Sequence, residues 1–472
     1  MRYLTKFSFW TVFLATFFFY IASFLIVYFS GINNLILQSE DLLPTSTLPF
    51  SILREGNVNL NEYYDLFVEN YPNPDTKTDT PYYLKKFDNN YYSAFPVLTP
   101  FLVLPLYIIP TFLNFDSSII GISIMSRIGG AFISALSVGF FYLLLKKIKS
   151  QNGNGERKKR YLSNYQILIL LLIYTFGTNM FSMNSQGLWQ HGTSTLFLSL
   201  GLLFVLKKRV ALAGLSFGLA TVARPTNLLS LVLFSTYFLF RKKNLFLSYI
   251  FYSSIPVIVD LIFNILIFNN IFNTGYGSQI GGWTGKFPEG FFGLWISPSK
   301  GILIYSPVFI FIFYGIYKSF QNFILSRKVD CLDMSEWFVF VLTSLAIFLH
   351  TLILGRWHHW YGGYSWGYRM VSDIIPYLTF LLIPFITSRY FSNWYIRIFF
   401  YALTFWSIFT HFLGVLMFDG LWHIVFDKGG RNTSWLWSFK DNQIFFAVKR
   451  ILFKVGLISS DPFSIVKNVE GK

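Results

Sequence analysis

Residues 7–30 read FSFWTVFLATFFFYIASFLIVYFS and carry no charged side chain. A helix needs about 20 apolar residues to cross a bilayer. This run is longer than the core of a signal peptide and lacks a small-x-small cleavage site after it, so we interpret it as a membrane anchor. The whole chain of 472 residues has the same character, with 54% hydrophobic and 13% charged residues. Soluble domains carry about 25% charged residues, so the sequence predicts a polytopic, all-α membrane protein.

Further apolar runs of similar size predict about 11 transmembrane helices in total. After the first, they begin near Ile119, Tyr165, Gly192, Val210, Asn227, Leu245, Gly301, Trp337, Val371 and Trp394. The net charge of +16 does not indicate a nucleic-acid partner, because the basic residues occur in short clusters between apolar runs. Such clusters are typical of membrane topology signals. The single cysteine, Cys331, excludes an internal disulfide.

Residues 97–113 form one more apolar run, but prolines interrupt it every four or five residues, and each removes a helix hydrogen bond. Basic clusters follow several predicted spans, at residues 146–160, 207–209, 241–243 and 327–328. If 97–113 does not span, all these clusters share the side of Arg2 and Lys6, as the positive-inside rule requires. We therefore predict an interfacial segment at 97–113, a cytoplasmic N-terminus and an extracytoplasmic C-terminus.

This topology divides the chain into four parts. They are the first transmembrane helix (1–30), an extracytoplasmic loop with membrane-surface helices (31–117), a transmembrane bundle with outer loops at 269–300 and 356–370 (118–418), and an extracytoplasmic tail (419–472). Residues 31–95 of the first loop hold nine of the 22 acidic residues in the chain. Long loops in compact proteins are usually functional or disordered, and its Pro-punctuated apolar stretches favour an ordered loop.

The first loop contains two candidate functional sites, the adjacent carboxylates of Glu40 and Asp41 and the tyrosine Tyr92. Glu40 and Asp41 are adjacent carboxylates just beyond the first span, and either could act as a general base for a hydroxyl nucleophile. They could equally be solvated loop charges or helix-start residues, since we expect a surface helix to start at Pro44. Tyr92, in the stretch YYSAFP, is either an interfacial anchor or part of a groove wall for a lipid chain.

Polar and aromatic residues also gather before the predicted spans. Trp189 and His191, in NSQGLWQHG, could contact a sugar, although a lone histidine is more often a packing or capping residue. Lys300, in GLWISPSKG, lies where a helix N-terminus would attract an anionic group, or it is a snorkelling lysine beside capping serines. Arg224 is either a phosphate contact or the partner of a charge on a neighbouring helix.

The densest constellation is RWHHWYGGYSWGYR, residues 356–369. Arginine binds phosphate through its planar fork and aromatic faces stack on sugars, so Arg356 and Arg369 are candidate phosphate ligands. The candidate sugar-binding aromatics of this stretch are Trp360, Tyr364 and Trp366. No metal site is predicted. The adjacent histidines lack partner spacing for zinc, and a divalent cation at Glu40 and Asp41 stays open because two carboxylates do not define a site.

Together these segments resemble the GT-C superfamily of membrane glycosyltransferases, in the bacterial branch similar to protein O-mannosyltransferases and lipid A aminoarabinose transferases. The segments that carry the resemblance are Asp41 with residues 48–56, then 92–96, 185–192, 293–307 and 360–369. The resemblance implies a bundle of 11 to 13 spans and inverting transfer from a polyprenyl- or dolichyl-phosphate-linked sugar. It also implies a catalytic acidic residue early in the first loop, which Asp41 matches. Two departures are Glu40 directly before Asp41 and Tyr368 in place of the usual proline before Arg369.

We therefore expect a hexosyl- or pentosyltransferase in the bacterial inner membrane that acts on its extracytoplasmic face. The expected partners are a polyprenyl-phosphate sugar donor, membrane lipids, and a glycan, lipid or protein acceptor. One alternative is a secondary transporter or lipid-linked sugar flippase, and another is an O-antigen-type ligase or polymerase. Only one of two adjacent carboxylates can face the donor carbon. The resemblance implies that this residue is Asp41, because its distance to Leu48 and Pro49 matches the family pattern, so we expect Asp41 to be the base.

Overall fold

The computed structural model describes residues 7–33, 37–71, 80–149, 162–271, 281–325, 334–427 and 432–459. Within these ranges the chain is mostly helical and contains a single two-stranded sheet. The longer helices outside the first loop are α1 (Phe9–Phe29), α5 (Ile119–Lys149), α6 (Asn164–Phe176), α8 (Gln190–Leu206), α9 (Val210–Ala223), α10 (Leu228–Arg241), α11 (Phe246–Phe268), α14 (Ile312–Ile324), α15 (Met334–Leu354) and α18 (Trp394–Met417). Shorter elements between and after them are α7 (Asn179–Ser182), α12 (Glu289–Ile296), α13 (Ile302–Tyr305), α16 (Ile375–Phe380), α17 (Ile383–Ile386), α19 (Leu421–Phe426) and α20 (Gln443–Lys454).

Among the described residues, seven helical stretches are long and apolar enough to cross a membrane. They are Phe9–Phe29, Ile119–Ile148, Asn164–Ser182, Lys243–Phe268, Glu336–Leu354, Arg369–Ile386 and Trp394–Met417. This finding supports an all-α membrane protein. The other runs predicted as spans form shorter or broken helices, because the chain turns at Lys208, which has a φ of 57°, and breaks at Pro225 and Pro307.

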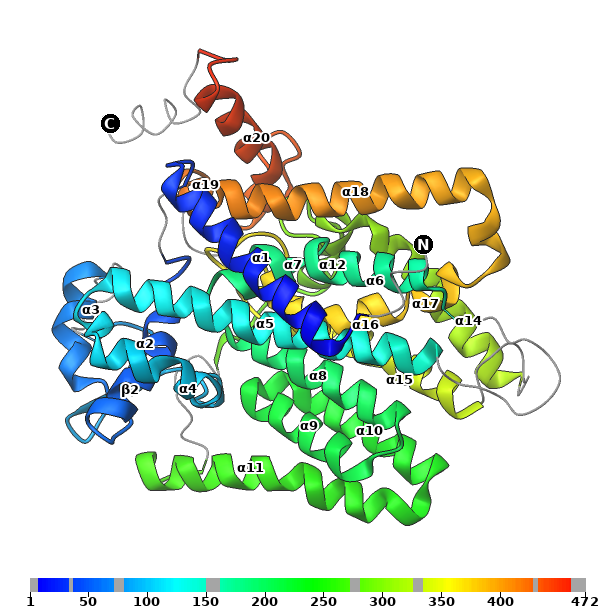
Figure 1. The fold of residues 1–472 in the computed structure, drawn as a ribbon, viewed down its shortest axis with the longest axis horizontal. Coiled ribbons are helices and arrows are strands. Elements are labelled where there is room, and N and C mark those ends of the chain that lie inside the picture. Colours follow the sequence, from blue (N-terminus) through cyan, green and yellow to red (C-terminus); the bar gives the residue numbers. More distant parts are fainter. Residues whose placement is uncertain are drawn as a thin grey trace.

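The helices pack in a row in which α5 lies against α1 and α8, α8 against α9, and α9 against α11 (Figure 1). Small residues allow the last of these contacts to be close. A Cβ on Gly214 would lie 2.8 Å from the Tyr249 carbonyl oxygen, and one on Gly218 would lie 2.4 Å from that of Ser253. This Gly-xxx-Gly spacing is the familiar device by which membrane helices approach backbone to backbone. Helix α11 is thereby held on one side, while Leu247, Phe251 and Leu266 on it stay exposed.

The first-loop segment, residues 31–117, is folded wherever the structure describes it. It contains α2 (Leu42–Arg54), α3 (Tyr64–Asn70), the antiparallel strands β1 (Leu84–Phe87) and β2 (Asn90–Ser93), and α4 (Leu98–Phe112). The strands turn through Asp88 and Asn89, which both have positive φ. Helix α2 begins at Leu42, so the expected start at Pro44 was wrong by two residues, and Asp41 occupies the N-cap position.

Helix α4 covers the proline-interrupted run. It continues through Pro105 and Pro110 and has 15 residues, fewer than the seven candidate spans. Its inner face packs on α2, where the rings of Phe50 and Tyr107 lie 4.7 Å apart. Arg54 is the last residue of α2. It forms an ion pair at 2.7 Å with Asp116, which follows α4 in the chain. The segment is thus supported by protein on one side, as freed backbone groups require.

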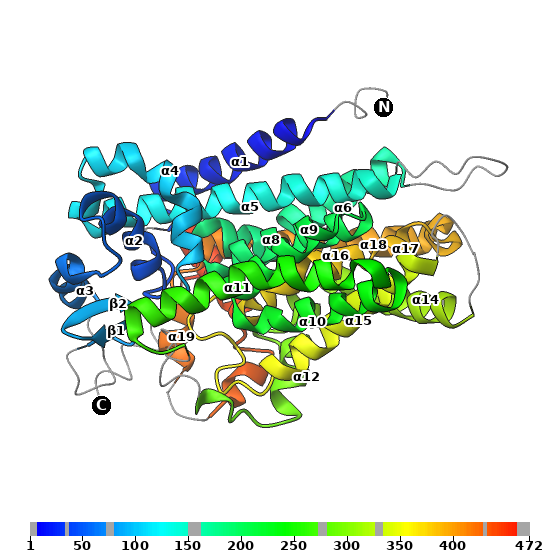
Figure 2. The same cartoon turned by 90° about the horizontal axis from the view of Figure 1, so that it is seen from below.

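The two ends of the bundle differ in character. The first-loop elements α2, α3, α4 and the β1–β2 hairpin gather at the left in Figures 1 and 2. The C-terminal end of α5, with Lys146 and Lys147, and the start of α11, after Lys242 and Lys243, lie at the right. The basic clusters at the end of α5 and before α11 therefore lie at the end of the molecule opposite the first-loop segment.

Candidate active site

Asp41 lies where three distant parts of the chain meet. Its Oδ1 accepts a hydrogen bond from the Tyr82 hydroxyl at 2.8 Å. Its Oδ2 forms an ion pair with Nη1 of Arg369 at 3.0 Å. Arg369 opens a 3-10 helix, Arg369–Ile374, that leads into α16. The Asp41 and Arg369 side chains are 17% and 14% exposed, so both are largely buried but reachable.

An aromatic plate lies beneath this ion pair. The guanidinium of Arg369 is 4.6 Å from the ring centre of Trp189, a cation–π distance. The Trp189 indole donates to Oε1 of Gln38 at 3.2 Å, and the Gln38 amide donates to the Ser182 carbonyl at 3.1 Å. Trp189 is therefore held at a fixed angle just before α8. The structure brings together Asp41, Arg369 and Trp189, which the sequence singled out separately.

Glu40 differs from its neighbour in its surroundings. Burial raises the pKa of the Glu40 carboxyl, the charge on Asp41 raises it further, and a hydrogen bond from Tyr82 opposes both. Burial and the two carboxylates raise the pKa of the Tyr82 phenol, so this group stays protonated and acts as a donor. Two carboxylates thus share one phenol, and the ion pair is made by Asp41 alone.

The raised pKa of Glu40 predicts a stabilising substitution. Folding favours its protonated form, so its contribution to stability is present below the ordinary pKa of a glutamate and is lost as pH rises through the raised folded-state pKa. Glu40→Gln should therefore raise the thermal unfolding midpoint at pH 7, and the gain should vanish at about pH 4, where unfolded glutamate is protonated. Glu62→Gln, at an exposed carboxylate, should show no such difference. An equal midpoint for wild type and Glu40→Gln at pH 7 would contradict the assignment.

Other basic groups surround Arg369. Burial lowers the pKa of the Lys300 amine, and the charge on Arg369 lowers it further. Burial, Lys300 and Arg369 lower the pKa of His423, and burial, His358 and Arg369 lower that of His359 to about 4. Burial is the first cause of all three pKa shifts, and repulsion from the positive charge on Arg369 adds to each of them. An anion bound among them would relieve that repulsion.

Lys300 is fully buried and does not snorkel to the surface. Its Nζ donates to the Ser365 carbonyl at 2.5 Å and lies 3.1 Å from Nε2 of His423. The helix that follows, α13, begins only at Ile302 and has four residues, so it provides no helix N-terminus for an anion. The expected capping by Ser297 is also absent for α13, since the Ser297 hydroxyl donates to the Leu436 carbonyl. Lys300 therefore ties the 356–369 stretch to α19.

A second buried cluster lies four residues along from Arg369. Asp373 accepts from Nη1 of Arg224 at 2.6 Å and lies 3.0 Å from Nδ1 of His191. Nδ1 of His191 also lies 2.7 Å from Nη1 of Arg224. This nitrogen can therefore form a hydrogen bond with Asp373 or with Arg224, but not with both at once. His350 approaches Asp373 to 4.0 Å. Of the two interpretations of Arg224, the structure favours the ion pair with a neighbouring helix; His191 lies in this cluster and does not contact Asp41.

The remaining candidates are dispersed. Trp360 and Trp366 are buried, Trp366 in edge contact with Tyr305. Tyr364 is exposed and stacks on His423 at 4.9 Å. Arg356 is exposed, and its carbonyl oxygen accepts a hydrogen bond from the Gly285 amide. Tyr92 lies on β2 beside Phe268 of α11.

Several site residues escaped the sequence reasoning. Asp373 had a usable signal, because an aspartate within an apolar run is expensive and functional by default. Tyr82 and Gln38 had none, since their roles depend on contacts across the fold. Within the described ranges, no group of three His, Cys, Asp or Glu side chains could hold a metal ion.

Comparison of the chain with family models, with curated proteins and with solved structures gives no match. The geometry of the site and the sequence are therefore the basis of the functional argument.

Proposed function

We propose that this protein is a membrane glycosyltransferase that transfers a sugar from a polyprenyl-phosphate donor to an acceptor hydroxyl, with inversion. The observation that carries the proposal is the ion pair between Asp41 and Arg369 over the face of Trp189. It combines an acidic group, a phosphate-binding group and a sugar-stacking surface. Asp41 occupies the N-cap position of α2. In the proposed orientation this residue lies at the membrane surface, where a lipid-linked donor would present its phosphate.

In this mechanism the donor phosphate replaces Asp41 as the ion-pair partner of Arg369. Charge-assisted bonds to phosphate are among the strongest that arginine makes. Burial and Arg369 disfavour the charged form of Lys300 in the free protein, and a bound phosphate would favour it. Asp41 is then free to accept the proton of the acceptor hydroxyl. The acceptor oxygen bonds to the anomeric carbon as the bond from that carbon to the phosphate oxygen breaks. The polyprenyl phosphate leaves with the electron pair, and the proton ends on Asp41.

We test the activity with the full-length protein in lipid nanodiscs, supplied with a panel of polyprenyl-phosphate sugars. Transfer to an acceptor, or hydrolysis in its absence, is followed by release of polyprenyl phosphate. Arg369→Lys should raise the donor KM at least about tenfold, because a lysine cannot bind phosphate in the bidentate manner of arginine. Protein that neither binds nor turns over any donor in the panel would contradict the proposal.

One observation favours a transporter or lipid-linked sugar flippase as the second candidate. The Arg224–Asp373 pair with His191 and His350 places several ionisable groups inside the bundle, as proton-coupled carriers do. Uptake or flipping of a lipid-linked sugar in proteoliposomes, without any glycosyl transfer, would select this alternative over the enzyme. A diphosphate-linked donor as the sole substrate would instead select an O-antigen-type ligase or polymerase.

We further propose 11 spans with the first-loop segment extracytoplasmic and the N-terminus cytoplasmic. The C-terminal end of α5 and the start of α11 lie at the end of the molecule opposite the first-loop segment (Figures 1 and 2), and both ends have lysines in sequence, which supports this orientation. The bundle then lies in the bacterial inner membrane with Asp41 on the outer side.

Cysteine labelling checks this orientation. In a Cys331→Ser background, Glu62→Cys should react with a membrane-impermeant maleimide in intact cells, because Glu62 is exposed on the first-loop segment. Lys208→Cys, exposed between α8 and α9, should react only after permeabilisation. The reverse pattern would place the ion pair on the cytoplasmic side and exclude every outer-face mechanism given above.

A further inference from the structure

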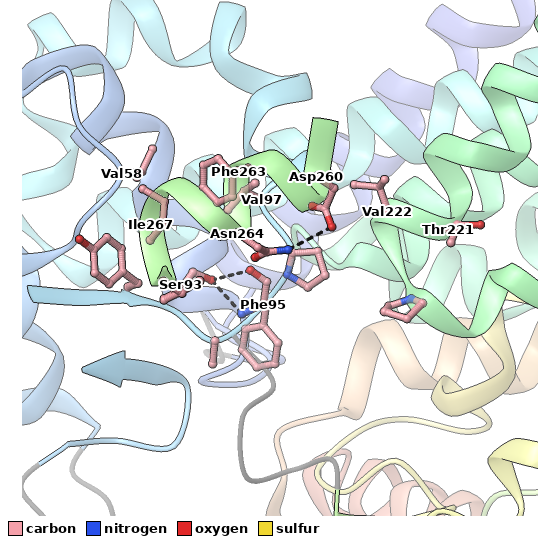
Figure 3. Close-up of a pocket in the computed structure, with 15 residues that line it drawn as sticks. Val58, Ser93, Phe95, Val97, Thr221, Val222, Asp260, Phe263, Asn264 and Ile267 are labelled. Atoms are coloured by element: carbon pink, nitrogen blue, oxygen red, sulfur yellow. Dashed lines mark hydrogen bonds between the residues drawn. The ribbon is translucent and has the colours of Figure 1, made fainter. Parts of the chain in front are cut away.

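A cavity separate from the Asp41 site lies between α11, the end of α9 and the linker from β2 to α4 (Figure 3). Its free volume is about 70 Å³, enough for a small polar group. Most of its wall is apolar, from residues such as Val58, Val97, Val222 and Ile267. Neither Asp41 nor Arg369 lines it.

Two polar side chains of α11 face this cavity. Asp260 and Asn264 are one helical turn apart, and the Asn264 amide lies 3.4 Å from Oδ2 of Asp260 (Figure 3). Asn264 is buried, with only 7% of its surface exposed, and Asp260 is half-buried. The lining contains no lysine, arginine or histidine, and within the described residues Asp260 has no ion pair. A carboxylate in a membrane-spanning helix without a cation is costly, so a partner from outside the chain is expected.

The surroundings of the cavity indicate where that partner comes from. On the other faces of α11, Val259, Ile262 and Leu266 are exposed apolar residues of a membrane-spanning helix. The residues of α11 that line the cavity lie between Asp260 and Phe268, the last residue of the helix, a stretch of about 12 Å of helix. A lipid beside α11 could thus place its headgroup in the cavity and keep its chains in the bilayer.

The chemistry of the wall narrows the class of ligand. A hard metal cation prefers six or more oxygen ligands, whereas this cavity offers one carboxylate, one amide and few hydroxyls. A primary ammonium needs fewer acceptors and donates hydrogen bonds to them. A quaternary ammonium cannot donate hydrogen bonds and would leave the Asp260 carboxylate without them.

We propose that this cavity binds the primary ammonium headgroup of a membrane lipid, with Asp260 as the counter-ion and Asn264 as a second hydrogen-bond acceptor. This inference rests on the membrane location of the chain and not on glycosyl transfer. Either can therefore fail without the other.

The test measures lipid retained by the full-length protein, by native mass spectrometry after extraction from nanodiscs. The probes are phosphatidylethanolamine, its N-acetyl analogue and phosphatidylcholine. The wild type should retain phosphatidylethanolamine at least about tenfold more strongly than either analogue, because only it supplies a charge-assisted hydrogen bond. Equal retention of the three lipids would overturn the proposal, and this comparison needs no variant.

Variants locate the site. Asp260→Asn should abolish the preference for phosphatidylethanolamine, whereas Asp65→Asn, which removes an exposed carboxylate on α3, should keep it. A preference unchanged in Asp260→Asn would overturn the assignment to this cavity. Stronger retention of phosphatidylcholine would indicate a site for a quaternary ammonium. Stabilisation by sodium alone that depends on Asp260 would indicate a site for an inorganic cation. Either result would overturn the proposal.

Discussion

Asp41→Asn is expected to lower turnover about 10²–10⁴-fold while donor binding persists, because removal of a general base costs that much in rate. The asparagine oxygen can accept from Arg369 in place of Oδ2, and its amide group can donate to the Tyr82 hydroxyl oxygen in place of Oδ1, so the local fold should survive. It cannot take the acceptor proton. With the competing charge gone, Arg369 is more available to the donor phosphate, and the donor KM should stay equal or fall. Steady-state transfer assays with donor and acceptor varied separately give both quantities.

Glu40→Gln is the matched control for that measurement. Glu40 lies beside Asp41 and near the same phenol but makes no ion pair with Arg369, so its loss should cost less than about tenfold in turnover, below the range of a general base. If Glu40→Gln is inactive and Asp41→Asn is active, the base has been assigned to the wrong one of the two. If both variants keep full activity, the proton goes elsewhere and the role of the first-loop segment in catalysis fails.

The contacts of Asp41 with Arg369 and Tyr82 affect the order of steps in the proposed reaction. In the absence of donor, its Oδ2 is occupied by Arg369 and its Oδ1 by Tyr82, which leaves little capacity to accept a proton. A donor phosphate that draws Arg369 away would activate the base only when the sugar is in place. Such an arrangement would limit futile reaction with water before the donor binds.

The sequence predicted the apolar helices and the residue types of the site, but not their pairing. Residues 7–30 indicated α1 because length and composition alone decide membrane insertion. The contact of Asp41 with Arg369 joins residues 328 positions apart, and no local pattern encodes it. The prolines of residues 97–113 predicted a segment that does not span alone and lies in the interface or against protein. In the structure this segment is α4, which is shorter than the candidate spans and packs on α2.

Because a local sequence pattern does not encode contacts between distant residues, the sequence left two roles open for Arg224. As an isolated charge in an apolar sequence, it was a reasonable phosphate ligand. Its partner Asp373 lies 149 positions away, in the 3-10 helix Arg369–Ile374. That helix packs on α8, and α8 packs on α9, which ends just before Arg224, so the pairing depends on contacts between distant segments. Charges inside a membrane protein therefore need to be considered as potential pairs, with each acidic residue of an apolar run tested against each basic one.

Asp373→Asn is expected to destabilise the protein by about 3–5 kcal/mol, because removing one partner of a buried ion pair leaves the other charge uncompensated. Asp373 is fully buried and the Arg224 side chain is 12% exposed, so water cannot replace the lost partner. The substitution also removes the carboxylate beside His191 and loosens the turn that carries Arg369. Thermal unfolding in nanodiscs should show the loss as a lower midpoint.

The double variant Asp373→Asn/Arg224→Gln separates charge compensation from simple damage to packing. Removing both charges should restore a large part of the stability, whereas two independent defects would add. Arg54→Gln is a control for loss of an ion pair in general: Arg54 is 36% exposed, and its partner Asp116 keeps the hydrogen bond from Tyr63, so the loss should be smaller. If the double variant is no more stable than Asp373→Asn, the two charges are not coupled. The 3-10 helix Arg369–Ile374 would then be held by its other contacts. In that case the Arg224–Asp373 pair would not help to position Arg369 against Asp41.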